Sequence, residues 1–126
     1  MTTVLLADDD QGVRTMLSIV LGTAGFEVAA HCDGESALQD ALHRVPDVAV
    51  LDVSMPGMSG LDVCRRLRAH PQTAQVPIVL LTALGEWLDV SSGFDAGADE
   101  YVVKPFSPKD LLHRIEQLLD PALPHM

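Results

Sequence analysis

The sequence is poor in cysteine, in basic residues and in long apolar runs. Its two cysteines, Cys32 and Cys64, lie far apart and show no metal-ligand spacing, which argues against a disulfide framework and favours a reducing, cytoplasmic setting. No apolar run approaches the ~20 residues that a membrane helix needs, so we expect no membrane association. Lysine and arginine number 8 against 18 acidic residues, and the formal net charge of −10 argues against direct nucleic-acid binding by this domain.

The remaining composition suits one compact domain. The chain has 126 residues, of which 48% are apolar, and this is enough for a single core and argues against disorder. We expect the domain to occupy residues 1–120. Residues 121–126 are predicted to form a C-terminal tail or the start of a linker.

Strand-like and helix-like segments alternate five times along the chain. The strand candidates are short and mostly apolar, as expected for parallel strands covered on both faces, and comprise residues 3–7, 26–30, 47–51, 77–81 and 101–103. The segments between them carry apolar residues at spacings of three and four, which is typical of helices that pack one face. Ser59 and Ser107 suit helix N-caps, and Gly25 and Gly97 suit helix ends. The alternation predicts a doubly wound α/β fold around a parallel five-stranded sheet.

Polar side chains follow four of the strand candidates. Asp8 and Asp9 come directly after the first, and Asp52 comes after the third. Thr82 follows the fourth and Lys104 follows the fifth. In doubly wound folds, ligands bind beyond the carboxyl ends of the strands, so we expect these side chains to converge there. Crowded carboxylates repel one another and call for a cation, for which Mg²⁺ is the natural hard partner, and a carboxylate beside Mg²⁺ and a lysine can accept a phosphoryl group.

These motifs resemble those of the receiver domain of bacterial two-component response regulators. The resemblance covers residue 4 to about residue 119 and rests on motifs that occur in the family's order: Asp8-Asp9, Asp52-x-x-Met55-Pro56-Gly57-x-x-Gly60, Leu80-Leu81-Thr82-Ala83, Gly97-Ala98-Asp99-Glu100-Tyr101 and Lys104-Pro105-Phe106. It implies a (βα)5 flavodoxin-like receiver fold with strand order 2-1-3-4-5. It also implies a phosphoacceptor signalling switch in a phosphorelay. Such a chain is not a turnover enzyme, beyond its own Mg²⁺-dependent phosphorylation and autodephosphorylation.

The resemblance assigns the phosphoryl chemistry by position. Asp52 would accept a phosphoryl group from the phosphohistidine of a sensor histidine kinase or a phosphotransfer protein. Asp8, Asp9 and Asp52 would bind Mg²⁺ together with the backbone carbonyl of Ser54. Lys104 would neutralise a phosphate oxygen, and the proline that follows it permits a cis peptide bond that would aim the ammonium inward.

The resemblance also implies how the switch is read. Thr82 and the backbone N–H of Ala83 would bind phosphate oxygens, and Tyr101 would change rotamer as Thr82 moves. The surface of helix four, strand five and helix five would then change its affinity for partners, including a second copy in a homodimer. Residues 87–92, which include Trp87, lack the basic residue that such dimers commonly carry on helix four.

Each of these residues also has a purely structural interpretation. An acid at a helix start can be an N-cap, and Asp10 is the acid for which we favour that role. Thr82 can form a strand-end turn, Lys104 can be a solvated surface residue, and Tyr101 can be a half-buried strand residue.

Two other functions compete with the switch. Aspartate-nucleophile phosphatases also use a strand-end aspartate with Mg²⁺, but they usually carry a second acid two residues after the nucleophile, where this chain has Ser54. The second alternative is a receiver-like docking module that works without phosphorylation. The complete set of site residues argues against this module. Labelling of Asp52 with a phosphoryl group would distinguish the switch from the docking module.

Overall fold

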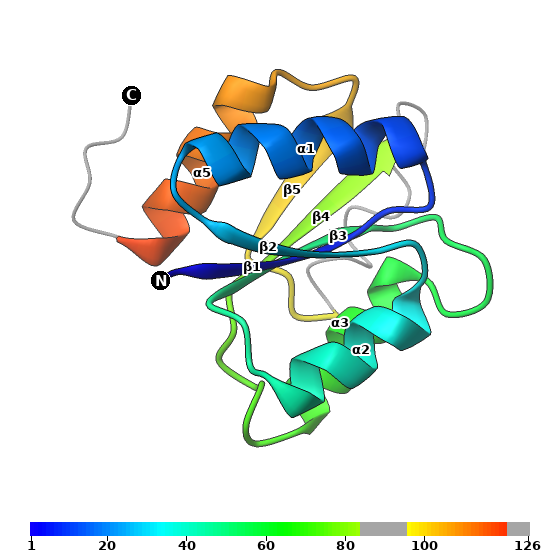
Figure 1. Cartoon of the computed structure of the whole chain (residues 1–126). Coiled ribbons are helices and arrows are strands. Elements are labelled where there is room, and N and C mark those ends of the chain that lie inside the picture. Colours follow the sequence, from blue (N-terminus) through cyan, green and yellow to red (C-terminus); the bar gives the residue numbers. More distant parts are fainter. Residues whose placement is uncertain (84–95, 121–126) are drawn as a thin grey trace.

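The computed structural model describes residues 1–83 and 96–120, and within them five strands form one parallel sheet (Figure 1). The strands are β1 (Thr3–Ala7), β2 (Glu27–His31), β3 (Val48–Asp52), β4 (Ile78–Ala83) and β5 (Glu100–Lys104). Their order is β2-β1-β3-β4-β5, which confirms the predicted order and fold class. The bounds of β1 are those predicted, and the other strands differ from the prediction by one or two residues at their ends.

Helices cover both faces of the sheet (Figure 1). One face is covered by α1 (Gln11–Thr23) and α5 (Pro108–Leu119), and the other by α2 (Gly34–His43) and α3 (Gly60–Ala69). Each layer has its own core cluster, because alternate residues of a strand point to opposite faces. The predicted fourth helix, which includes Trp87, lies outside the described residues, as does the predicted tail. No helix in the described part of the chain combines the length and apolar character of a membrane span.

Side-chain caps begin the described helices near the carboxyl edge of the sheet. Asp10 accepts a hydrogen bond from the backbone N–H of Val13, so its predicted capping role is confirmed. Asp33 caps α2, Ser59 caps α3 and Ser107 caps α5, so both predicted serine caps are also confirmed. These caps place the starts of the helices, with their positive dipole ends, close to the ends of the strands.

Arg68 ties the beginnings of β4 and β5 to α3. Its guanidinium donates to the carbonyl of Gly97 at 2.9 Å and to the carboxylate of Asp99 at 2.9 Å, as well as to two carbonyls of the loop before β4. The same Asp99 oxygen accepts a hydrogen bond from the backbone N–H of Ile78 at 2.8 Å. Gly97 has φ of 106°, and a Cβ on it would overlap the Arg68 side chain, so glycine is required at this turn.

Candidate functional site

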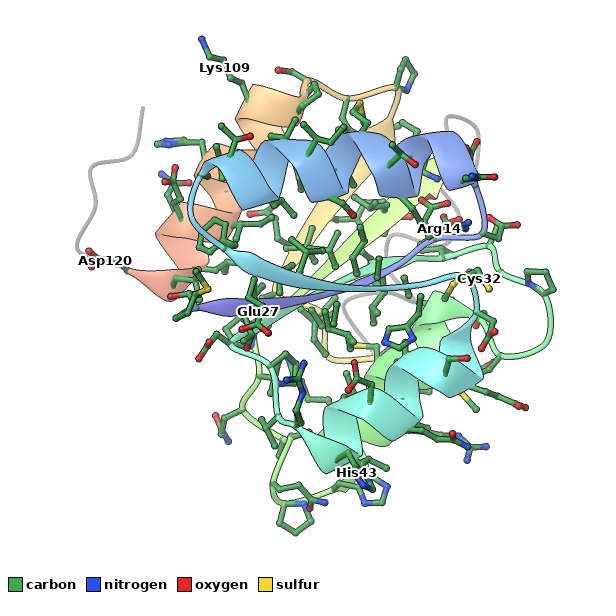
Figure 2. All side chains as sticks on the ribbon, in the orientation of Figure 1. Arg14, Glu27, Cys32, His43, Lys109 and Asp120 are labelled. Carbon is green, nitrogen blue, oxygen red and sulfur yellow. The ribbon has the colours of Figure 1, made fainter. Side chains whose placement is uncertain are left out.

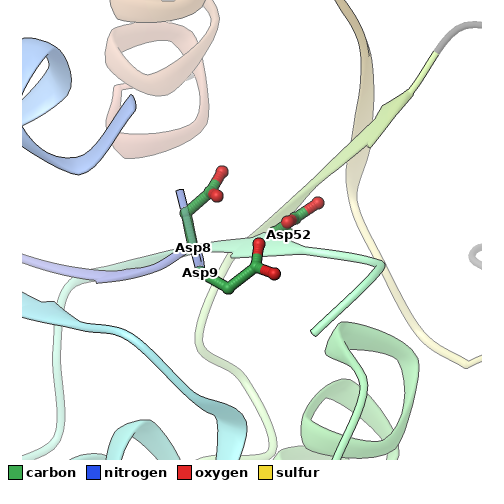
Figure 3. Close-up of side chains that lie close together, drawn as sticks. All are labelled: Asp8, Asp9 and Asp52. Carbon is green, nitrogen blue, oxygen red and sulfur yellow. The ribbon is translucent and has the colours of Figure 1, made fainter. Parts of the chain in front are cut away.

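Three carboxylates meet beyond the ends of β1 and β3 (Figure 3). Asp8, Asp9 and Asp52 each offer an oxygen, and these oxygens all lie within 4.8 Å of one another. The two strands are direct neighbours in the sheet, with Ala7 opposite Leu51, so the residues that follow them come out at the same edge. Asp8 and Asp52 are buried, whereas Asp9 is exposed. The structure therefore brings together the three acids that the sequence predicted to meet.

Lys104 reaches the acids from the far edge of the sheet. Its Nζ lies 2.8 Å from Oδ2 of Asp8 and 3.5 Å from Oδ1 of Asp52. Lys104 stands opposite Ala83 in the register of β4 and β5, so its side chain has to cross the end of β4. The peptide bond between Lys104 and Pro105 is cis, as predicted. The lysine is thus a partner of both buried acids, with its shorter contact to Asp8.

The pleat of the sheet sorts the site into two sides. Asp8, Asp52 and Lys104 share one face, because the residues two positions before them belong to the core cluster under α1 and α5: Leu6, Val50 and Val102. Thr82 and Tyr101 belong to the opposite face, because Leu80 lies in the cluster under α2 and α3 and stands opposite Tyr101 in the register.

Asp8 is held by hydrogen bonds on its backbone as well as its side chain. Its N–H donates to the carbonyl of His31 at 3.1 Å, and its Oδ1 accepts from the N–H of Asp10 at 2.9 Å. Its carbonyl accepts a hydrogen bond from Nη1 of Arg14 at 2.7 Å. The sequence does not single out Arg14, because an arginine near the start of an amphipathic helix looks like any solvated cation.

The site carries an excess of negative charge. Burial, followed by the charge of Asp8, raises the pKa of Asp52 to about 7, although the charge of Lys104 acts to lower it. Burial works against the charge of Lys104, but the hydrogen bond to Asp8 and the charges of Asp52 and Asp8 outweigh it and raise the pKa of the lysine. One ammonium group therefore faces three carboxyl groups. A set of hard oxygen donors with this excess charge fits Mg²⁺.

The remaining predicted site residues lie around this cluster. Thr82 is buried at the end of β4, and its Oγ1 donates to the carbonyl of Ala83 at 3.5 Å. Tyr101 is half-buried and packs against the core cluster under α2 and α3. Ser54 is exposed in the loop after β3. Thr82 and Tyr101 lie on the same face of neighbouring strands, two residues apart in register, and this is close enough for their side chains to be coupled.

An apolar hollow of about 410 Å³ opens beside Lys104. Its other walls come from the start of α1 and from the loop after β5: Val13, Met16, Pro105 and Phe106. An apolar surface next to reactive polar groups suits the approach of a protein partner.

The predicted dimer surface is described only in its β5 and α5 parts. Val103 is exposed on β5, and Lys109 is exposed on α5. Arg114 pairs within its own chain, with Glu100 at 2.8 Å and with Asp110 at 3.1 Å. Its charge is therefore already engaged in this structure.

Comparison with known proteins places these features in one family. The family model "Response regulator receiver domain" matches residues 4–116. The chain is 47% identical over 116 residues to the DNA-binding response regulator MtrA of Mycolicibacterium smegmatis, covering 92% of this chain and 50% of that protein. It is 39% identical to the phosphate regulon transcriptional regulatory protein PhoB of Rhizobium meliloti, covering 98% of this chain and 54% of that protein. The chain thus spans about half the length of these curated relatives.

The fold comparison agrees with the sequence comparison. The crystal structure of a putative response regulator from Chloroflexus aurantiacus superimposes with a TM-score of 0.89 at 43% identity, covering 94% of this chain and 97% of that one. The similarity therefore extends over nearly the whole of the described fold.

Proposed function

Because the chain belongs to the response regulator receiver domain family, which signals in two-component systems, we propose that Asp52 is its phosphoryl acceptor. The observation that carries the proposal is the setting of Asp52. Its carboxylate is buried, clusters with two other acids within 4.8 Å and lies 3.5 Å from Lys104 Nζ. A carboxylate in this setting faces both the metal donors and the cation that a phosphoryl group needs.

The transfer balances as a displacement at phosphorus. The P–N bond of a phosphohistidine on the partner breaks as an oxygen of Asp52 forms the new P–O bond, and the imidazole keeps the electron pair and takes up a proton. Lys104 neutralises one phosphoryl oxygen, and Thr82 with the N–H of Ala83 binds others. Because the nucleophile is held in place, much of the barrier is overcome by positioning.

The same acids would hold the metal that the transfer needs. Asp8, Asp9 and Asp52, with the carbonyl of Ser54, are the residues that would bind Mg²⁺. When bound, Mg²⁺ offsets the charge that spreads over the phosphoryl oxygens during transfer. The chain is a switch and not a turnover enzyme, since its cycle consists of its own phosphorylation and dephosphorylation.

Thr82 and Tyr101 transmit the change. A phosphoryl group on Asp52 draws the Thr82 hydroxyl toward the acids, and the space that this opens on the α3 side of the sheet lets Tyr101 move inward. Two states of the surface formed by β5, α5 and the fourth helix predicted from the sequence then differ in partner affinity, and phosphorylation shifts the population between them.

The partners follow from this surface and from the apolar hollow beside Lys104. A sensor histidine kinase or phosphotransfer protein would bring its phosphohistidine to the acids by packing on Val13, Met16 and Phe106. A homodimer through helix four, β5 and α5 is a further partner state. The relatives, a DNA-binding response regulator and a transcriptional regulatory protein, are about twice as long as this chain. We therefore propose that this chain controls an output that lies outside it, and that it does not itself bind nucleic acid.

The test is labelling by acetyl phosphate or by a phosphorylated kinase in the presence of Mg²⁺. We expect one acid-stable, hydroxylamine-sensitive phosphoryl group on the parent, none on Asp52→Ala, and normal labelling of Asp110→Ala, which removes an exposed acid from α5. Labelling that survives Asp52→Ala would refute the assignment. A parent that folds and binds Mg²⁺ but is never labelled would favour the phosphorylation-independent docking module.

A further inference from the structure

Arg14 lies at the end of α1 where the helix begins, beside the loop that carries the acids (Figure 2). Side chains of a helix lean toward its N-terminus, so an arginine at the fourth helical position can reach back past the start of the helix. Nη1 of Arg14 donates to the carbonyl oxygen of Asp8 at 2.7 Å, and the side chain is partly buried. We propose that Arg14 is a positioning residue of the metal site, which fixes the peptide between Asp8 and Asp9 and thereby aims the carboxylate of Asp9 at the metal.

The contact is directed at a peptide and not at a charge. None of the ion pairs among the described residues includes Arg14, although three carboxylates lie nearby. A cation kept close to an acidic cluster for charge alone would pair with a carboxylate. A hydrogen bond from a charged donor to a carbonyl is instead a strong and directional restraint on the main chain.

The restrained peptide is the one that decides where Asp9 points. The carbonyl of Asp8 lies in the same rigid plane as the N–H and Cα of Asp9, so holding the oxygen holds the plane. Asp8 has its own side-chain restraints, from the N–H of Asp10 and from Lys104. Asp9 is exposed, so core packing does not fix its direction, and the peptide plane orients it together with its contact to the Asp52 carboxyl group.

A positioning role and a purely electrostatic role of Arg14 predict opposite changes in Mg²⁺ affinity when its side chain is removed. A positive charge near the site repels a divalent cation, so if Arg14 acted through charge alone, its removal would tighten Mg²⁺ binding. If Arg14 positions Asp9, its removal loosens Mg²⁺ binding despite the lost repulsion. Groups that orient metal ligands typically change metal affinity by about 10- to 100-fold when they are removed.

The inference rests on the proposed function, because it concerns the same Mg²⁺ site. Its test is the dissociation constant of the divalent ion, measured by calorimetry with Mg²⁺ and by electron paramagnetic resonance of free Mn²⁺, for the parent and three variants. Arg14→Met removes the donor, Arg14→Lys keeps the charge with a shorter reach, and Arg44→Met is the matched control. Arg44 is also an arginine, but it is 65% exposed and its contact to Glu27 is 3.9 Å long.

We expect Arg14→Met to bind Mg²⁺ about tenfold more weakly, Arg14→Lys to fall between it and the parent, and Arg44→Met to match the parent. Unchanged or tighter binding by Arg14→Met overturns the inference. If urea titrations show that Arg14→Met is unfolded without metal, the affinity of Arg14→Lys decides the question. Parent-like Mg²⁺ affinity of Arg14→Lys then overturns the inference. A parent that binds neither ion refutes the proposed metal site itself, which is a different result.

Discussion

Replacing Asp52 with asparagine is predicted to stabilise the metal-free protein at pH 8. The folded protein raises the pKa of this carboxyl from 3.8 to about 7, chiefly by burial and then by the charge of Asp8. A raised acid contributes stability that is complete below its unfolded pKa and is lost as the pH rises through its folded pKa. At pH 8 the folded protein therefore carries an ionised carboxylate that the unfolded chain would accommodate at less cost.

The size of the effect follows from the same two values. At about 1.4 kcal/mol for each pH unit, the difference between 3.8 and about 7 corresponds to about 4 kcal/mol. Asparagine keeps the shape and removes the charge, but it also weakens the 3.5 Å contact with Lys104 and introduces a donor that needs an acceptor. We therefore expect a gain of about 1–3 kcal/mol in the free energy of unfolding.

The assay is urea unfolding in EDTA at pH 8 and pH 5, repeated with saturating Mg²⁺ at pH 8. The gain is expected at pH 8 and should shrink at pH 5, where the parent carboxyl is largely protonated. Mg²⁺ should stabilise the parent more than the variant, because ligand binding to the folded state adds stability by mass action. Glu27→Gln, which removes the same charge from an exposed position, is the control. An equal gain at both pH values, or no gain at pH 8, would refute the reasoning.

Three further predictions follow from other contacts of the site and core. Lys104→Met should lower the free energy of unfolding of the metal-free protein by about 2–3 kcal/mol, because it leaves Asp8 buried without its cation. Urea titrations measure this loss, and a smaller loss than in the Glu27→Gln control would contradict the prediction. Gly60→Ala should lower the free energy of unfolding by about 2 kcal/mol or more and weaken Mg²⁺ binding, because a Cβ at this position would overlap the main chain of Asp52. Urea titration and calorimetry measure the two effects, and parent-like values for both would be inconsistent with this packing. Burial raises the pKa of Cys64 to about 11, so iodoacetamide at pH 8 should modify the exposed cysteine and spare this one, as read by mass spectrometry. The stabilisation from keeping the Cys64 thiol neutral is complete below pH 9 and should be lost as the pH rises through about 11.

Much of the fold was predictable, because the apolar patterns and the capping residues of the sequence both agree with the topology of a parallel sheet. The strand from Thr3 to Ala7 is apolar, is followed at once by acids and has the bounds that its sequence predicts. Ser59 and Ser107 cap their helices as expected, because a hydroxyl before an apolar run has one dominant use. The convergence of Asp8 and Asp52 follows from the parallel sheet, in which neighbouring strands end at the same edge.

The individual contacts of the basic side chains were not predictable from the sequence, because they depend on the exact three-dimensional positions of the strand ends. The motifs place Lys104 on a phosphate oxygen, but they do not predict that it lies closer to Asp8 than to Asp52. Nor do they single out Arg14 or Arg68, because the main partners of both are main-chain carbonyls, which every residue carries. A pattern of side-chain types does not reveal a contact whose acceptor is the backbone.

The separation of the site across the two faces of the sheet bears on how such chains diverge. The buried acids and their lysine face α1 and α5, whereas Tyr101 packs on the side of α2 and α3. On the proposed function, substitutions around Tyr101 that spare Thr82 would leave the contacts of Asp8 and Lys104 in place. Partner choice could then diverge between related chains while the phosphoryl chemistry is kept.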